Sequence, residues 1–142
     1  MRVGEVMTRD VEVIMPSDTI QLAAKLMDDL GVGALPVCDG ERLVGMITDR
    51  DIVVRLIAEG KDPASAHVDD AMSKNVRSVR EDAAIDEVLQ VMRNAQVRRV
   101  PVVNNSNELV GIVSMADVAS ATRESGKVGD TVEKISEAPP NN

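Results

Sequence analysis

Residues 43–52 read Leu-Val-Gly-Met-Ile-Thr-Asp-Arg-Asp-Ile, and residues 109–118 read Leu-Val-Gly-Ile-Val-Ser-Met-Ala-Asp-Val. In both stretches an apolar run is followed by a hydroxyl residue, and an aspartate comes three positions after it. Ser and Thr are favoured helix caps, and acidic residues are favoured in the first helical turn. The chain is therefore predicted to contain the same strand-to-helix connection twice.

The repetition extends outward from these two stretches. Val3 corresponds to Val68 and Pro36 to Pro101, an offset of 65 residues that becomes 66 at the quoted stretches. The added residue falls in a turn, which is Asp39-Gly40 in the first copy and Asn-Asn-Ser-Asn over 104–107 in the second. Such residues tolerate left-handed backbone, so each copy is predicted to contain a β-hairpin.

A helical pattern precedes each hairpin, over residues 18–30 and 83–95. The first of these helices is expected to be capped by Ser17 or Asp18 and to end at Gly31. The order in each copy then starts with a strand and a helix, followed by the two strands of the hairpin.

A second helix is expected after each hairpin, over residues 49–59 and 115–123, with Gly60 and Gly126 as stop signals. The mix of β-branched and helix-forming residues favours an α/β or α+β class, and the order of elements favours α+β of the α/β type. We expect two tandem β-α-β-β-α repeats, and the boundaries fall at 1–60 for repeat 1, 61–67 for the linker, 68–125 for repeat 2 and 126–142 for a flexible C-terminal tail.

Composition excludes several classes of protein. The 142 residues are 44% hydrophobic and 28% charged, which is typical of a soluble globular chain. A net charge of -8 and the absence of Phe, Tyr and Trp argue against nucleic-acid binding, because phosphates would be repelled and no aromatic ring is present for base stacking. No apolar stretch is long enough for a signal peptide or a membrane span, so we expect a cytoplasmic protein without membrane contact.

The first helix carries two apolar stripes. One stripe can cover the sheet, and the other requires a partner, which is either the other repeat or a second copy of the chain in a homodimer. The first stripe consists of Ile20, Ala23, Ala24 and Met27, and the second of Leu22, Leu26 and Leu30.

The paired hydroxyl residue and aspartate, Thr48 with Asp51 and Ser114 with Asp117, have two interpretations. One is a capping box, which stabilises a helix without any ligand. The other is a nucleotide site, because backbone N–H groups and a hydroxyl bind phosphate while a carboxylate accepts hydrogen bonds from sugar hydroxyls. Glycines at 45 and 111 allow either close approach of a ligand or tight strand packing.

Both copies carry glycine, two apolar-leaning residues, Ser or Thr, two variable residues and Asp. With this motif the chain resembles a tandem pair of CBS domains, a Bateman module, over residues 3–123. The resemblance implies two repeats packed with pseudo-two-fold symmetry, adenosine-type ligands in clefts between them, and association of two pairs into a disc.

The resemblance also implies roles for individual residues. Asp51 and Asp117 would bind ribose hydroxyls, and Thr48 and Ser114 would bind phosphate. Basic residues before the Pro-containing strand meet phosphates in the family, so the second site is expected to bind first. The remaining candidates are Arg98 and Arg99 for phosphate at the second site, Arg50 for the first site, and Val11, Val76, Pro36, Val37, Pro101 and Val102 for adenine.

Each basic candidate also has an interpretation without a ligand. Arg98 and Arg99 would equally protect an edge strand from unwanted pairing. Arg50 would equally form a surface ion pair with a nearby acid.

The sequence favours a regulatory sensor that needs no cofactor, binds AMP, ADP or ATP, and signals to an unknown effector protein in trans. Enzymatic activity is not expected, because the single histidine, His67, and the single cysteine, Cys38, show no catalytic pattern. A ligand-free dimerisation module remains an alternative. A metal or redox sensor that uses Cys38 and His67 is another.

Overall fold

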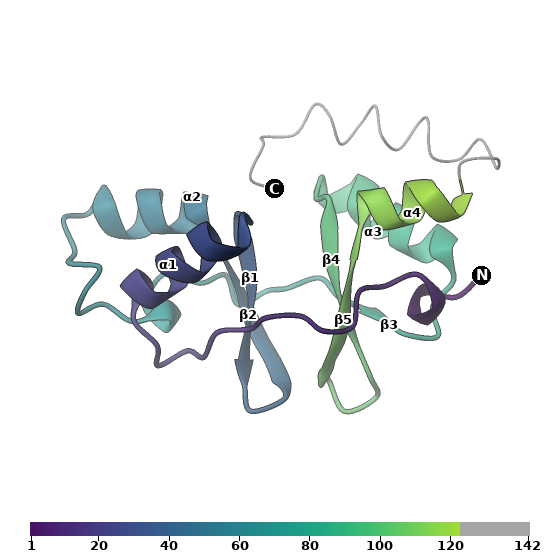
Figure 1. The fold of residues 1–142 in the computed structure, drawn as a ribbon, viewed down its shortest axis with the longest axis horizontal. Helices are drawn as coiled ribbons and strands as arrows, with labels where there is room; N and C mark the ends of the chain where they lie inside the picture. The colour runs from purple at the N-terminus through teal and green to yellow at the C-terminus, as the bar shows by residue number, and fades with distance from the viewer. Residues whose placement is uncertain (123–142) are drawn as a thin grey trace. The chain divides into compact units, whose positions relative to one another are not determined.

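The computed structural model describes residues 1–122, which form two compact units. The first unit consists of residues 12–76, and the second combines residues 1–11 with residues 77–122 (Figure 1). The start of the first sequence repeat therefore packs with the second repeat, so the compact units do not coincide with the repeats in the sequence. The expected helix residue Arg123, Gly126 and the tail 126–142 lie outside the described residues.

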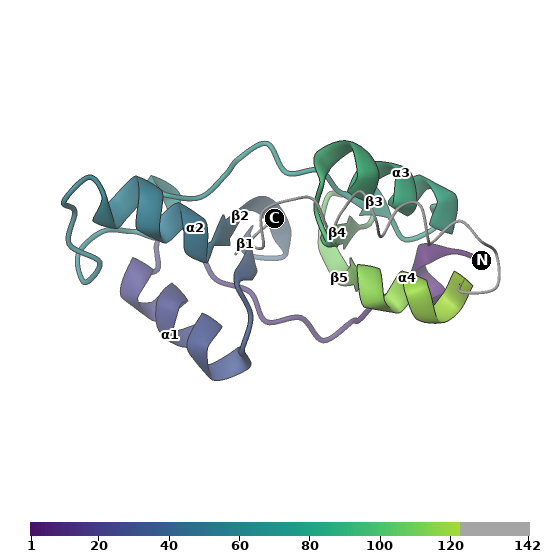
Figure 2. The same ribbon diagram turned by 90° about the horizontal axis from the view of Figure 1, so that it is seen from above.

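The first unit is an antiparallel hairpin covered by helices. Strand β1 pairs with β2, and Gly40 in the turn has a φ of 63°, as its left-handed role requires. Figure 2 shows α1 and α2 side by side in this unit. Its elements are α1 (Ile20–Leu30), β1 (Ala34–Asp39), β2 (Arg42–Thr48), α2 (Asp49–Ile52), the π-helix η2 (Val53–Ile57) that continues α2, and the 3-10 turn η3 (Val68–Asp70).

The second unit repeats this plan with one more strand. Strand β3 runs parallel to β4, and β4 is antiparallel to β5. The turn of its hairpin contains Asn107 at a φ of 61°. Its elements are η1 (Val3–Glu5), β3 (Val79–Arg80), α3 (Ile85–Ala95), β4 (Arg99–Val103), β5 (Leu109–Ser114) and α4 (Met115–Thr122).

Helix α1 begins later than expected, and its cap is Thr19, not Ser17 or Asp18. The Thr19 hydroxyl oxygen accepts a hydrogen bond from the Leu22 N–H at 3.2 Å. Asp18 is engaged elsewhere, because its carboxylate accepts from the Met15 N–H at 2.9 Å. The C-terminal end is as expected, since Gly31 has left-handed backbone with a φ of 66°.

The first strand expected in each repeat is short or reduced to a single bridge. In the second unit it is β3, and in the first unit it is only the parallel bridge between Ile14 and Val37. Val79 and Arg80 both pair with β4, whereas in the first copy only Ile14 forms a bridge and the backbone N–H of the next residue, Met15, donates to the Asp18 carboxylate at 2.9 Å. The first unit therefore has a two-stranded sheet and the second a three-stranded one.

Each unit has its own apolar core. Val68 lies fully buried in the core of the first unit, and its repeat counterpart Val3 lies fully buried in the core of the second. The Val3 and Gly4 N–H groups donate to the Ala83 and Glu81 carbonyl oxygens, both at 2.9 Å. The N-terminal residues are thus structural parts of the second unit. No helix within residues 1–122 has both the length and the apolar character needed to cross a membrane.

Candidate functional site

The duplicated motif forms two corners, one in each unit, where a strand leads into a helix. At the first corner the Thr48 hydroxyl oxygen accepts from the Asp51 N–H at 3.0 Å, and the Asp51 carboxylate accepts from the Thr48 N–H at 2.9 Å. At the second corner the Ser114 hydroxyl oxygen accepts from the Asp117 N–H at 3.1 Å, and Asp117 accepts from the Ser114 N–H at 2.9 Å. Both corners are therefore capping boxes.

The capping boxes use only one oxygen of each aspartate. The Oδ2 atoms of Asp51 and Asp117 take part in the boxes. The Oδ1 atom of Asp51 lies 3.9 Å from the Arg55 Nε, and the Asp51 side chain is 14% exposed. The box fixes the direction of the carboxylate and leaves its second oxygen able to accept hydrogen bonds. A capping role and a ligand role are therefore compatible at these corners.

Backbone pairing brings the basic candidates to the second corner. Arg99 is the cross-strand partner of Ser114, and the Met115 N–H donates to the Arg98 carbonyl oxygen at 2.7 Å. Both arginine side chains are exposed. The backbones of Arg98 and Arg99 thus lie beside the start of α4, and their two exposed side chains carry positive charge.

The equivalent backbone positions at the first corner carry no charge. Ala34 is the cross-strand partner of Thr48, and the Asp49 N–H donates to the Gly33 carbonyl oxygen at 2.9 Å. Arg50 is exposed on the first turn of α2, and its N–H donates to the Asp49 carboxylate at 2.8 Å. The two corners have the same backbone geometry and different charges.

The motif glycines serve packing, which resolves their two sequence interpretations. A Cβ atom built on Gly45 would lie 2.8 Å from the Ser73 carbonyl oxygen and 2.9 Å from the Met72 sulfur. A Cβ atom on Gly111 would lie 2.7 Å from both the Thr8 carbonyl oxygen and the Met7 sulfur. The segments around Ser73 and Thr8 lie directly on β2 and β5, so only glycine fits there.

The residues proposed to contact adenine differ in their exposure. Val11 and Val76 are half-buried and lie outside the strands. Val37 and Val102 are 0% exposed and belong to the two cores. Pro36 and Pro101, which precede them, are also buried. The strands β1 and β4 therefore have no open side-chain surface at these positions.

Two residues at the first corner were not identified from the sequence. Asp49 accepts a hydrogen bond at the start of α2, and Arg55 lies beside Asp51 while its Nη1 donates to the Ala71 and Met72 carbonyl oxygens at 3.3 and 3.2 Å. Arg55 follows Asp51 by four residues, and on a helix this spacing predicts that the two side chains lie side by side.

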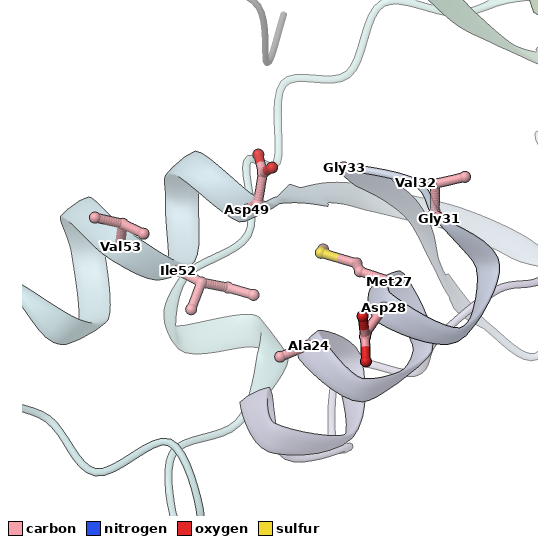
Figure 3. A pocket seen from close by; sticks show the side chains of 9 residues that line it. All are labelled: Ala24, Met27, Asp28, Gly31, Val32, Gly33, Asp49, Ile52 and Val53. Carbon is pink, nitrogen blue, oxygen red and sulfur yellow. The ribbon is translucent and has the colours of Figure 1, made fainter.

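A pocket of about 510 Å³ borders the first corner within its unit. Figure 3 shows Met27 of α1 and Ile52 of α2 pointing into it, with Asp49 at its rim. Two carboxylates contribute to an otherwise apolar or glycine lining. The full lining comprises Ala24, Met27, Asp28, Gly31, Val32, Gly33, Asp49, Ile52 and Val53.

The two residues of the metal alternative differ in environment. Cys38 is 2% exposed in β1, and burial raises the pKa of its thiol, which disfavours the thiolate that binds metals. His67 is exposed, and its backbone N–H donates to the Asp70 carboxylate at 3.0 Å. Residues 1–122 contain no cluster of three or more His, Cys, Asp or Glu side chains suited to a metal ion.

The CBS domain model matches residues 3–58 and 68–124, which is most of the chain. The chain belongs to the CBS domain family. Hypoxic response protein 1 of Mycobacterium tuberculosis is 42% identical over 116 residues, which cover 81% of this chain and 80% of that protein. The tandem repeat and the fold inferred from the sequence are thereby confirmed.

Solved structures of CBS proteins match the fold and hold different ligands. The crystal structure of Hypoxic Response Protein I with two coordinated zinc ions has a TM-score of 0.79 at 40% identity, covering 85% of this chain and 98% of that one. CBSX2 in complex with AMP has a TM-score of 0.75 at 27% identity, covering 87% and 96%. The CBS domain pair of MJ0100, with 5-methylthioadenosine and S-adenosyl-L-methionine, has a TM-score of 0.72 at 28% identity, covering 85% and 98%.

Proposed function

We propose that the chain is a regulatory sensor that binds an adenosine-containing ligand at its Thr48–Asp51 and Ser114–Asp117 corners. The second corner, with Arg98 and Arg99, takes a phosphorylated ligand of the AMP, ADP or ATP type. The chain then signals to a partner protein in trans, because a ligand that prefers one of two conformations shifts their populations.

The observation that carries this proposal is the preorganised carboxylate. Asp51 and Asp117 are each fixed by one backbone N–H, and each has a second oxygen that a capping role does not use. Two vicinal hydroxyls of a ribose are suitable donors to such an oxygen. The complexes of CBSX2 with AMP and of MJ0100 with two adenosine compounds support a ligand of this class.

Adenine itself must be recognised without aromatic stacking, since the chain has no Phe, Tyr or Trp. The half-buried Val11 and Val76 are the side chains proposed to lie against the base. The buried residues of β1 and β4 are proposed to contribute backbone groups. Selectivity for adenine then rests on hydrogen bonds to the main chain.

Calorimetric titration tests the proposal, with adenosine, AMP, ADP, ATP, 5-methylthioadenosine and S-adenosylmethionine as ligands. We expect AMP, ADP or ATP to bind, and Asp117→Ala to weaken that binding at least about tenfold. The control is Asp82→Ala, which removes an exposed carboxylate elsewhere in the same unit. Absence of binding by every compound at millimolar concentration would favour the ligand-free dimerisation module instead.

We also propose that the sensor is a homodimer formed through the first unit. Helix α1 and the π-helix η2 expose large apolar side chains, which soluble monomers rarely gather on neighbouring elements. The side chains with their exposed fractions are Leu22 at 48%, Leu30 at 44%, Val53 at 59%, Val54 at 47% and Ile57 at 52%.

Sedimentation equilibrium tests the dimer. The variant Val53→Asp places a charge on the exposed face and is expected to yield monomers, because an unpaired charge in an apolar interface is costly. Ala119→Asp, at the repeat counterpart of Val53, is the matched control and is expected to leave the dimer intact. A wild-type chain that sediments as a monomer at high concentration would contradict this part of the proposal.

A further inference from the structure

The backbone N–H groups that start α2 all have acceptors. Asp49 donates to the Gly33 carbonyl oxygen at 2.9 Å, Arg50 donates to the Asp49 carboxylate at 2.8 Å, and Asp51 donates to the Thr48 hydroxyl oxygen at 3.0 Å. A phosphate at the start of a helix is normally bound by such N–H groups. At the first corner the Asp49 carboxylate has already taken the Arg50 N–H and adds a negative charge of its own.

The second corner lacks this carboxylate. Met115 stands in the place of Asp49, and its N–H has the equivalent partner, the Arg98 carbonyl oxygen, at 2.7 Å. Asp117 likewise donates to the Ser114 hydroxyl oxygen at 3.1 Å, as Asp51 does to Thr48. The exchange of aspartate for methionine is therefore a change of side-chain charge on an unchanged backbone.

The Asp49 carboxylate lies in the space beside Gly33 that a side chain at position 33 would need. A Cβ atom on Gly33 would lie 3.0 Å from the Asp49 Oδ2. The counterpart of Gly33 is Arg98, whose side chain faces no aspartate at position 115. At the second corner this position carries the cationic side chain of Arg98. At the first corner Gly33 has no side chain, and the Asp49 carboxylate lies there instead.

The pocket beside the first corner is also negatively charged. Its lining contains the carboxylates of Asp28 and Asp49 and no basic residue (Figure 3). The repeat counterparts of Asp28, Gly33 and Asp49 are Arg93, Arg98 and Met115. The formal charge of these three positions therefore changes from two negative to two positive between the copies.

We propose that Asp49 is a specificity-determining residue that excludes phosphorylated ligands from the first corner, which instead takes an adenosine derivative without phosphate, either uncharged or cationic. The inference rests on the proposed function, in which both corners bind adenosine compounds. A carboxylate repels a phosphate placed beside it, and the exposed Arg50 offsets only one of the two negative charges.

Methyl-methionine NMR distinguishes the two corners in the full chain. Met27 lines the pocket of the first unit, and Met115 is the first residue of α4 at the second corner. Titrations use adenosine and AMP as probes. We expect the Met27 signal to respond to adenosine at a concentration at least about tenfold lower than to AMP. The Met115 signal should respond to AMP at least as readily as to adenosine.

The variant Asp49→Asn keeps the size of the side chain and its hydrogen-bond acceptor and removes the charge. We expect it to bring the AMP midpoint at Met27 to within about threefold of the adenosine midpoint. Asp29→Asn, an exposed neighbouring site on α1, is the control and should leave the wild-type difference unchanged. A thermal melt of each variant verifies that it is folded.

Three results would overturn the inference, and they are distinguishable from failure of the proposed function. If AMP and adenosine shift Met27 at the same concentration, the first corner accepts phosphate and Asp49 is not a barrier. If Asp49→Asn leaves the difference unchanged, another residue is responsible. If neither probe shifts either methionine, the proposed function fails and the inference fails with it.

Discussion

The two corners of this CBS pair have the same backbone hydrogen bonds and different side chains around them. In both units a hydroxyl residue and an aspartate form a capping box, and the first helical N–H donates to the carbonyl oxygen before the Pro-containing strand. Around that shared frame, the first corner has Asp49 and the second has Arg98 and Arg99. Identical backbone geometry therefore does not mean that the corners bind the same ligand.

The exposed helical side chains of the two copies also differ at equivalent positions. The first unit exposes five large apolar side chains on α1 and η2. Their counterparts in the second copy are polar, charged or small residues, and the second copy as described, up to residue 122, has no matching group of exposed large apolar side chains. The paired positions are Leu22 with Glu87, Leu30 with Ala95, Val53 with Ala119, Val54 with Ser120 and Ile57 with Arg123. The residues that the copies share are mainly those that the fold itself requires.

The glycine pair gives the largest expected effect. Gly45→Ala and Gly111→Ala each force a Cβ atom within 2.8 Å of a backbone carbonyl oxygen, and we expect each to destabilise its unit by about 3 kcal/mol. Urea denaturation measures the loss. Ser120→Ala, at an exposed position of α4, is the control. Full stability of either glycine variant would show that the segment on its strand is not held there.

The valine pair tests which unit each N-terminal segment stabilises. The segment with Val3 packs in the second unit, and the segment with Val68 packs in the first. Val3→Ala and Val68→Ala each remove two buried methyl groups, for an expected loss of about 2 kcal/mol. Hydrogen exchange locates the loss. Val3→Ala is expected to speed exchange in β4 and β5, and Val68→Ala in β1 and β2. Equal acceleration in all four strands by either variant would contradict the division into two units.

The repeat made much of this fold predictable from the sequence. Local patterns with known physical causes predicted the two hairpins, the approximate positions of the helices and the duplicated capping motif. Gly31 and Gly40 have the left-handed backbone that their positions indicated. The stripe of Ile85, Val88, Leu89 and Met92 is buried, as a helical period predicts.

Other features depend on tertiary contacts that a local pattern does not contain. The sequence could not show that Val3 packs with the second repeat, because the two segments are more than 70 residues apart. Thr19 and Asp18 are both suitable helix caps. Thr19 has this role because the Asp18 carboxylate accepts from the Met15 N–H of the preceding segment. The role of Asp49 depends on a contact with Gly33 that the hairpin pairing creates.

The aspartate pair should have a smaller effect on stability. Asp51→Ala and Asp117→Ala each remove the carboxylate half of a capping box, and we expect a loss of about 1 kcal/mol in each case. Thermal unfolding without ligand measures this contribution. Asp51 also lies 3.9 Å from Arg55, whereas the counterpart of Arg55 is Ala121. A loss above about 3 kcal/mol would show that the carboxylate holds more of the fold than its cap.

The cysteine should have the smallest effect, because its counterpart in the second copy is Val103. Cys38→Val is expected to change stability by well under about 1 kcal/mol at neutral pH, since both side chains are small and apolar. Burial raises the pKa of the Cys38 thiol, so the folded state keeps its proton where the unfolded state has lost it. Wild type should therefore lose stability relative to the variant as the pH rises above about 8.5, the ordinary pKa of a free thiol.

The same variant decides the metal alternative. Zinc bound by the wild type and lost in Cys38→Val, with adenosine binding intact, would establish a metal site that the second copy cannot have, since Val103 offers no ligand atom. We expect equal and negligible zinc in both proteins after dialysis, because the buried, protonated thiol is a poor ligand. The difference between the copies at this position then reduces to the packing of two apolar side chains of similar size.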